Sequence, residues 1–185
     1  VTSPPYDNLR DYNGYSFDFE SIAKELFRIT TVGGVVVWVV GDATINGSET
    51  GTSFNQALFF KDVGFNLHDT MIYDKGYAPN TQKNRYNNWS TKDKIGYKHP
   101  AMFPEKLAGK HILSWSNEND LVYDCFMGSG TTAKMCLLHN RNYIGSEISK
   151  EYIDISTKRT EQYKMQLRLL WINFSYLMMS MKIEW

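Results

Sequence analysis

The chain alternates between stretches with the apolar spacing of a helix and short apolar runs bounded by glycine or turn residues. Helical spacing, at a period near 3.6, is found at residues 16–30, 53–64, 103–116, 128–140 and 150–170. Strand-like runs, either continuous or alternating, are found at residues 35–40, 65–75, 117–126 and 141–149. This repeated alternation predicts an α/β fold with a mostly parallel sheet and helices on both faces.

Local signals set the expected ends of several elements. Ser16 or Asp18 can cap the first helix, and Gly33-Gly34 is the expected stop. The β-branched run at 35–40 predicts a strand that is buried on both faces. Gly64 is expected to end the second helix, and an alternating strand should follow at 65–75.

The most informative stretch joins an apolar strand to a helix through glycines. Asp124 ends the strand, Gly128-Ser129-Gly130 follow, and Thr131-Thr132 open the helix. Glycines let a backbone approach a ligand closely, and the N–H groups at a helix start can bind its oxygens. Glu147 follows the next strand at roughly the 20-residue offset of a carboxylate that binds ribose hydroxyls. The alternative is a tight turn with ordinary caps.

Two familiar phosphate motifs do not fit this loop. No Gly-Lys-Ser/Thr follows the glycines, which excludes a phosphate-binding P-loop. Ala133 stands where a dinucleotide-binding loop would have its third glycine. The pattern therefore favours an adenosine-type ligand that has no bound polyphosphate.

The chain opens with Ser3-Pro4-Pro5-Tyr6, a rigid turn, because proline fixes φ and cannot donate to a helix or a sheet. With "DCFMGSGTT" and "HPAMFPEKL", this motif resembles the beta-class DNA amino-methyltransferases of restriction-modification systems. The resemblance covers nearly the whole chain, and it includes the order in which the catalytic motif precedes the cofactor motifs. It implies a Rossmann-like methyltransferase fold with permuted motif order and S-adenosylmethionine as cofactor.

By that resemblance, the chain is a site-specific DNA methyltransferase that acts on the exocyclic amine of a flipped base. The Ser3 hydroxyl and the Pro4 carbonyl would accept the amine hydrogens, Pro5 would help to fix that carbonyl, and Tyr6 would stack on the base. Glu147 would accept from the cofactor ribose. The other implied cofactor-binding residues are Phe103, Pro104, Asp124, Phe126, Gly128, Ser129, Gly130, Thr131 and Thr132. Phe103 and Phe126 could equally be core aromatics.

The identity of the methylated base and the function of the chain each have alternatives. Ser3 at the head of the motif favours cytosine N4, since adenine enzymes of this class more often carry aspartate there, but either side chain can accept a hydrogen. A catalytically impaired DNA-binding remnant is one alternative function. A methyltransferase of small molecules or proteins is another, and the basic aromatic loop disfavours it.

Length and composition predict one domain over residues 1–185. By the resemblance, the short basic loop at 76–98 stands in place of a target-recognition region or remains from one. From Lys75 to Lys110 there are eight lysines and arginines against two carboxylates, although the whole chain has no net charge. Tyrosines and a tryptophan lie among these bases, as in nucleic-acid-binding segments, although a solvated loop has the same composition. The expected contacts to DNA phosphates are Lys83, Arg85, Lys92 and Lys94.

The remaining signals concern compartment and partners. Cys125 and Cys136 fit neither a disulfide framework nor a metal site, so we expect reduced packing residues and no metal. The apolar stretch 167–181 contains Arg168 and is too short for a membrane span, which favours a packed helix or strand over an amphipathic membrane or partner surface. The aromatic residues after Leu170 could cover a sheet edge. We expect a cytoplasmic, nucleoid-associated bacterial or phage protein that binds double-stranded DNA. A homodimer and a cognate restriction endonuclease acting on the same site are compatible with the resemblance.

Overall fold

The structure is a computed structural model that describes residues 1–5, 17–73 and 103–180, with side chains in the last helix up to 169 except for 168. The chain divides into two compact units, which are described separately. Unit 1 comprises Val1–Thr2 and Asp93–Trp185, and unit 2 comprises Ser3–Lys92. The prediction of one domain over 1–185 stays a prediction. The basic loop at 76–98, with Lys83, Arg85, Lys92 and Lys94, lies outside the described residues.

Unit 1 is built around a parallel strand pair and the helix that connects the two strands. Strand β3 (Leu121–Asp124) pairs in parallel with β4 (Asn142–Gly145), and α4 (Thr131–Leu138) lies between them in sequence. Helix α4 packs against both strands and against α3 (Glu105–Trp115) and α5 (Lys150–Ser180). The predicted α/β organisation is therefore confirmed, with two strands in the described part of this sheet.

The core of unit 1 lies between α3, α4 and β3. Its buried members are small or medium apolar side chains: Ala108, Ile112, Val122, Met135 and Cys136. Helix α3 begins directly after Pro104, whose fixed φ and missing N–H suit the start of a helix. The predicted helix at 103–116 and the predicted strands at 117–126 and 141–149 are thus confirmed within a few residues at each end.

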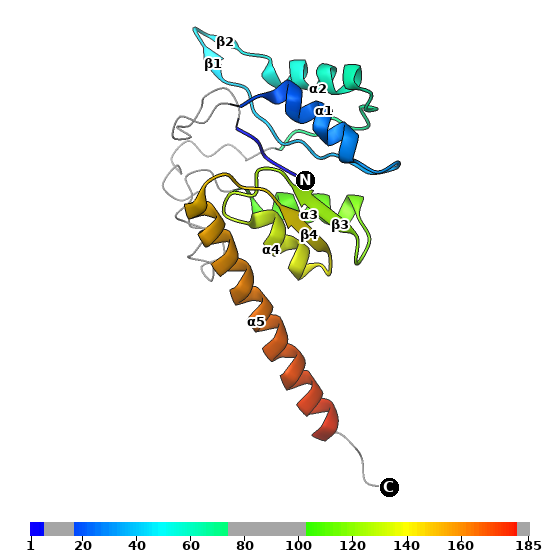
Figure 1. Ribbon diagram of the computed structural model, residues 1–185, viewed down its shortest axis with the longest axis vertical. Coiled ribbons are helices and arrows are strands. Elements are labelled where there is room, and N and C mark those ends of the chain that lie inside the picture. The colour runs from blue at the N-terminus through cyan, green and yellow to red at the C-terminus, as the bar shows by residue number, and fades with distance from the viewer. Residues whose placement is uncertain (6–16, 74–102, 181–185) are drawn as a thin grey trace. The chain divides into compact units, whose positions relative to one another are not determined.

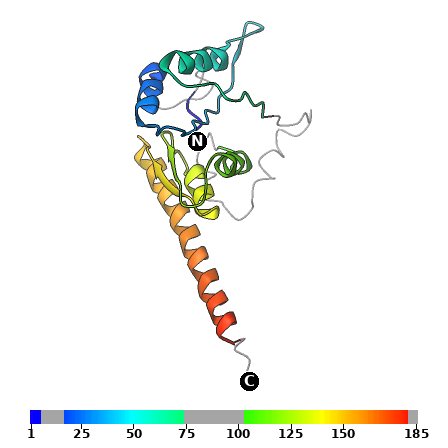
Figure 2. The same cartoon turned by 90° about the vertical axis from the view of Figure 1, so that its right-hand side faces the viewer.

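Helix α5 is longer than predicted. It continues to Ser180, ten residues beyond the expected end at 170, and it extends past the other elements of unit 1 (Figures 1 and 2). Residues 171–180 continue this helix, in agreement with the prediction of a packed helix or strand at 167–181, and covering of a sheet edge by this tail stays a prediction. No glycine or proline follows position 150, so no local signal ends the helix earlier. Among the described residues, no helix has the length and apolar character needed to cross a membrane.

Unit 2 is formed by two helices, a hairpin and an aromatic core. Helix α1 (Phe19–Ile29) starts at Asp18, whose Oδ1 accepts from the Ser21 N–H at 3.1 Å, as one of the two predicted caps. Helix α2 (Thr52–Val63) ends at Gly64, as predicted, and packs against α1 (Figure 1). The ring centroids of Phe19 and Phe60 lie 5.4 Å apart, which joins the two helices through aromatic packing.

Two predicted strands of unit 2 are wrong in the described residues. Within 35–40, only Trp38 forms an isolated bridge, and Val35 is 45% exposed. The Trp38 indole N–H donates to Gln56 Oε1 at 2.8 Å and its ring packs on Phe60, so contacts with α2 organise this run instead of a ladder. Residues 65–73 form no strand, and Ile72 is 92% exposed. Strand geometry needs a hydrogen-bonded neighbour, and the described residues provide none there.

One hairpin was not predicted. Strand β1 (Thr44–Ile45) pairs antiparallel with β2 (Ser48–Glu49) across Asn46-Gly47. Both turn residues have positive φ, 52° and 81°, which is the geometry of the tight hairpin turn that Asn-Gly favours. The Asn-Gly dipeptide was therefore the available sequence signal.

Candidate functional site

The glycine loop runs from the end of β3 to the start of α4, as predicted. Gly128 and Gly130 have φ values of +49° and +79°, a conformation that costs other L-residues energy. A Cβ on Gly130 would also lie 2.8 Å from Ser156 Cβ and 3.1 Å from Ser156 Cα. Glycine at 130 is therefore required both by the backbone conformation and by the close approach of α5.

The side chains of the glycine loop are buried. Ser129, Thr131 and Thr132 are at most 4% exposed. The first N–H groups of an α-helix lack intrahelical partners and carry partial positive charge, so the start of α4 suits a carboxylate or another anionic group. The predicted role of residues 128–132 in holding a cofactor depends on this backbone.

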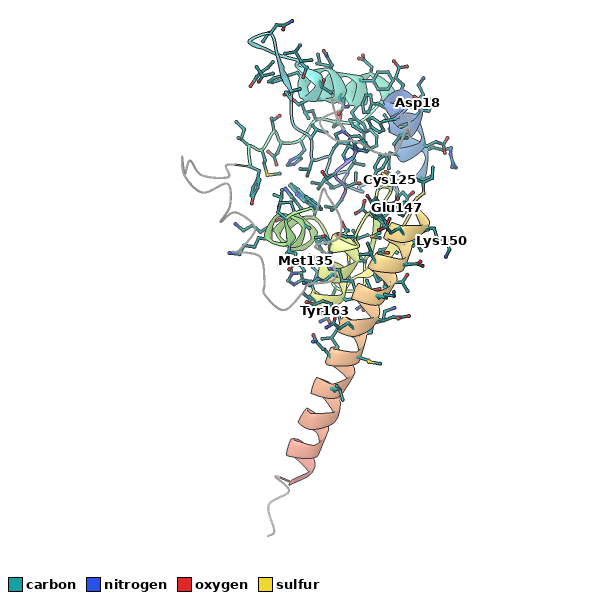
Figure 3. All side chains as sticks on the ribbon, turned by 90° about the vertical axis from the view of Figure 1, so that its left-hand side faces the viewer. Asp18, Cys125, Met135, Glu147, Lys150 and Tyr163 are labelled. Atoms are coloured by element: carbon teal, nitrogen blue, oxygen red, sulfur yellow. The ribbon has the colours of Figure 1, made fainter. Side chains whose placement is uncertain are left out.

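Glu147 meets the glycine loop directly. Its Oε2 accepts from the Gly128 N–H at 2.8 Å and its Oε1 accepts from the Ser149 N–H at 2.9 Å. Parallel pairing places the carboxyl ends of β3 and β4 at one edge, and Figure 3 shows Glu147 and Cys125 close together there. Each carboxylate oxygen has a second lone pair, so Glu147 can also accept from a ribose hydroxyl.

Asp124 has a use that the sequence did not indicate. It is 3% exposed, and its Oδ1 accepts from the Thr2 hydroxyl at 2.6 Å and from the Phe126 N–H at 3.0 Å. The Val1 N–H group donates to the Tyr123 carbonyl at 3.0 Å. Asp124 therefore joins the first residues of the chain to the start of the glycine loop.

The opening motif begins directly after Thr2, the residue that Asp124 binds. Ser3 is bonded to Thr2, so their Cα atoms lie about 3.8 Å apart. Pro4 is buried, and Ser3 and Pro5 are half-buried. Tyr6 lies outside the described residues. Thr2, the residue of unit 1 that precedes the motif, is thus fixed at the end of β3 by Asp124.

The two predicted residues before α3 lie at the edge of the core. Phe103 packs against the core of unit 1, which agrees with the interpretation of this ring as a core aromatic. Pro104 precedes the first turn of α3, and its carbonyl accepts from the Leu107 and Ala108 N–H groups at 3.0 Å. Phe126 is half-buried within the glycine loop. Contact of these residues with a cofactor stays a prediction.

Neither cysteine is a ready nucleophile. Burial is the main factor that raises the pKa of the Cys125 thiol to about 11, and burial likewise raises the pKa of Cys136 to about 12. Both thiols are therefore protonated near neutral pH, and the thiolate is the nucleophilic form. Covalent catalysis through a cysteine is disfavoured in this site.

Three residues that contact the loop or its neighbours were missed by sequence reasoning. Thr2 supports Asp124, while Glu105 and Arg159 lie behind the glycine loop. Glu105 belongs to the quoted "FPEKL" segment, so its acidic side chain in the first turn was a usable signal. Arg159 gave none, because a single arginine in a helix usually lies at the surface.

A βαβ unit with a glycine loop and an acid after the second strand defines a Rossmann-like nucleotide-type binding protein. The family model described as DNA methylase, of the N6/N4 type, matches residues 1–91 and 82–158. The chain therefore belongs to this DNA methylase family, whose cofactor is S-adenosylmethionine.

Similar proteins agree with the family. The orphan methyltransferase M.BamHII of Bacillus amyloliquefaciens is 48% identical, with 88% of each chain covered. The type II methyltransferase M.Cfr9I of Citrobacter freundii is 36% identical, covering 87% of this chain and 80% of the relative. Among solved structures, a putative DNA modification methylase of Thermus thermophilus, in complex with S-adenosyl-L-methionine, has a TM-score of 0.60 at 23% identity, with 88% and 86% covered. That likeness shows the fold.

The alignment with one relative includes positions that this chain does not fill. The alignment with M.BamHII has 233 positions but spans 88% of these 185 residues, about 163, so about 70 of its positions have no counterpart here. The family model matches in two stretches that overlap at residues 82–91. Together these two stretches cover residues 1–158 of the chain.

Proposed function

We propose that the chain transfers a methyl group from S-adenosylmethionine to the exocyclic amine of a flipped base in double-stranded DNA, with cytosine N4 favoured over adenine N6. One observation carries this proposal. In unit 1, Asp124 binds both Thr2, which precedes the Ser-Pro-Pro turn, and the N–H of Phe126 in the glycine loop. The motif that would activate the base and the loop that would hold the cofactor thus share one anchor.

The residues present fit the cofactor. The start of α4 offers N–H groups for the cofactor carboxylate, and Glu147 offers acceptors for ribose hydroxyls. The half-buried Phe126 ring lies in the same loop. When bound, the cofactor supplies an electrophilic methyl group on a sulfonium ion. Every other part of the chemistry falls to the protein and the DNA.

The protein's part is to prepare a poor nucleophile. The lone pair of an exocyclic amine is delocalised into the base ring. The Ser3 hydroxyl and the Pro4 carbonyl would each accept a hydrogen bond from one amine N–H. These bonds favour a tetrahedral nitrogen whose lone pair is no longer delocalised into the ring. Proline fixes the direction of that carbonyl through its locked φ, so little ordering is needed when the base enters. Tyr6 would stack on the base, a contact of about 1–3 kcal/mol in nucleic-acid sites.

Part of the DNA contact would be made to the backbone. Lys83, Arg85, Lys92 and Lys94 are suited to phosphates, which position a protein without reading sequence. We therefore propose that the basic loop at 76–98 holds the DNA by its phosphates. A homodimer, a paired endonuclease, and a cytoplasmic, nucleoid-associated location are compatible with this role.

Methyl transfer from labelled S-adenosylmethionine to duplex DNA, followed by nucleoside analysis, tests the proposal. Label in N4-methylcytosine is expected. Label in N6-methyladenine would support the proposed methyl transfer but show that the base is adenine and not cytosine. Binding of cofactor and DNA without any transfer would favour the catalytically impaired DNA-binding remnant.

Thr2→Val should destabilise unit 1 and slow turnover. The substitution keeps the shape of the side chain but removes a buried hydrogen bond to a carboxylate, which should lower the free energy of unfolding by about 1.5–3 kcal/mol. Turnover should fall because Ser3 loses its anchor, and Thr2→Ser should restore both properties. Urea denaturation and single-turnover methyl transfer measure the two effects. Wild-type stability in Thr2→Val would show that the hydroxyl anchors nothing.

A further inference from the structure

Arg159 of α5 lies fully buried directly behind the glycine loop. Its Nη1 lies 3.0 Å from the Ser129 carbonyl, 3.3 Å from Ser129 Oγ and 3.0 Å from Thr131 Oγ1. Its Nη2 donates to Glu105 Oε1 at 2.7 Å. A single side chain therefore contacts two residues of the loop and the first turn of α3.

Glu105 joins this arrangement to α4. The same oxygen, Oε1, accepts from Lys134 Nζ at 2.6 Å, and Lys134 is 2% exposed. The Lys134 ammonium also lies 4.4 Å from the centre of the Tyr163 ring of α5, a residue that Figure 3 marks on that helix. One carboxylate thus holds two buried cations, and one of them, Arg159, also contacts Ser129 and Thr131 of the glycine loop.

Because Arg159 is buried, its hydrogen bonds restrict the conformation of the glycine loop. A buried guanidinium must have its donors satisfied, and its planar fork fixes where the acceptors lie. The acceptors here are the carbonyl of Ser129 and the hydroxyls of Ser129 and Thr131, on either side of Gly130. At Gly130 itself, α5 approaches so closely that no Cβ would fit beside Ser156. Helix α5 therefore constrains both the conformation and the position of residues 129–131.

We propose that Arg159 is a positioning residue for the cofactor: it holds the Ser129–Thr131 backbone in the shape that binds S-adenosylmethionine, and Glu105 holds Arg159. This inference rests on the proposed function, since it assumes that the loop binds that cofactor. Arg159 holds the loop through its hydrogen bonds to the buried Ser129 and Thr131. The N–H groups at the start of α4, those of Thr131 and Thr132, are then presented to the cofactor in a preset arrangement, which lowers the ordering cost of binding.

Arg159→Met and Lys134→Met form a matched pair that tests this role. Each removes one buried cation from Glu105, but Arg159→Met also removes the bonds to the loop. We expect Arg159→Met to raise the dissociation constant of labelled S-adenosylmethionine, measured by equilibrium dialysis, by about 10-fold or more. Lys134→Met should stay within a factor of about 3 of the unsubstituted chain.

The readout separates positioning from general stability. A residue with a merely structural role would lower the number of binding-competent molecules and leave the dissociation constant of the remainder unchanged. If Arg159→Met does not fold, Arg159→Lys replaces it, since lysine keeps a cation for Glu105 but lacks the planar fork. If whichever of Arg159→Met and Arg159→Lys folds has an unchanged dissociation constant, the inference about Arg159 is overturned and the proposed function is not affected. Absence of binding by the unsubstituted chain overturns the proposed function as well.

Discussion

Ser3→Ala is expected to lower the rate of methyl transfer by about 100-fold, in line with the loss of one preorganised hydrogen-bonding group in an active site. The substitution removes one of the two proposed acceptors for the amine hydrogens, so the lone pair of the nitrogen stays in the base ring. The glycine loop and Glu147 are unchanged, so the dissociation constant of S-adenosylmethionine should stay within a factor of about 3. Single-turnover transfer from labelled cofactor and equilibrium dialysis measure the two quantities.

Ser48→Ala is the control for this substitution. Ser48 lies in the exposed β2 strand of the hairpin, and its hydroxyl contacts only a local carbonyl, that of Glu49, among the described residues. Its rate should equal that of the unsubstituted chain. An equal loss of cofactor binding and turnover in Ser3→Ala would show that the opening turn is structural and that the proposed chemistry is wrong.

Gly130→Ala is expected to cause the largest loss of stability. Its φ of +79° costs an alanine about 1–2 kcal/mol. The new methyl group would also meet the Cβ and Cα of Ser156 at 2.8 and 3.1 Å, and such overpacking costs about 1–3 kcal/mol more. We expect the free energy of unfolding, measured by urea denaturation, to fall by the sum of the two effects.

Gly33→Ala separates these effects. Gly33 has nearly the same φ, +81°, but a Cβ there would meet nothing within 4 Å. It should therefore show the conformational cost of about 1–2 kcal/mol without the steric one. Equal losses in the two variants would mean that α5 yields to the methyl group, and the tight contact between α5 and the loop would then be ruled out.

The sequence predicted the strand, glycine loop, helix and strand that frame the candidate cofactor site because these signals are local. The order strand, glycines, helix and strand fixes the parallel pair, and parallel pairing then brings Glu147 to Gly128. Asp124 was identified as important, but its partner Thr2 is more than 120 positions away in the sequence. No local pattern indicates such a pair.

Predictions failed where tertiary contacts override a local pattern. The run at 35–40 has the composition of a buried strand, but Trp38 packs on α2 and the described residues supply no ladder beside it. Arg159 was missed for a related reason, since its burial depends on three acceptors from the loop and one from α3. Helix α5 was predicted to end at residue 170, although the sequence has no stop signal there.

The most direct test of the central claim is a crystal structure of the chain with S-adenosylhomocysteine, the product that any such transfer leaves behind. We predict that this ligand lies against the backbone of residues 128–132, with its ribose hydroxyls bonded to Glu147 and its sulfur facing Ser3 and Pro4. A ligand bound elsewhere, or one whose sulfur faces away from the Ser-Pro-Pro turn, would contradict the account.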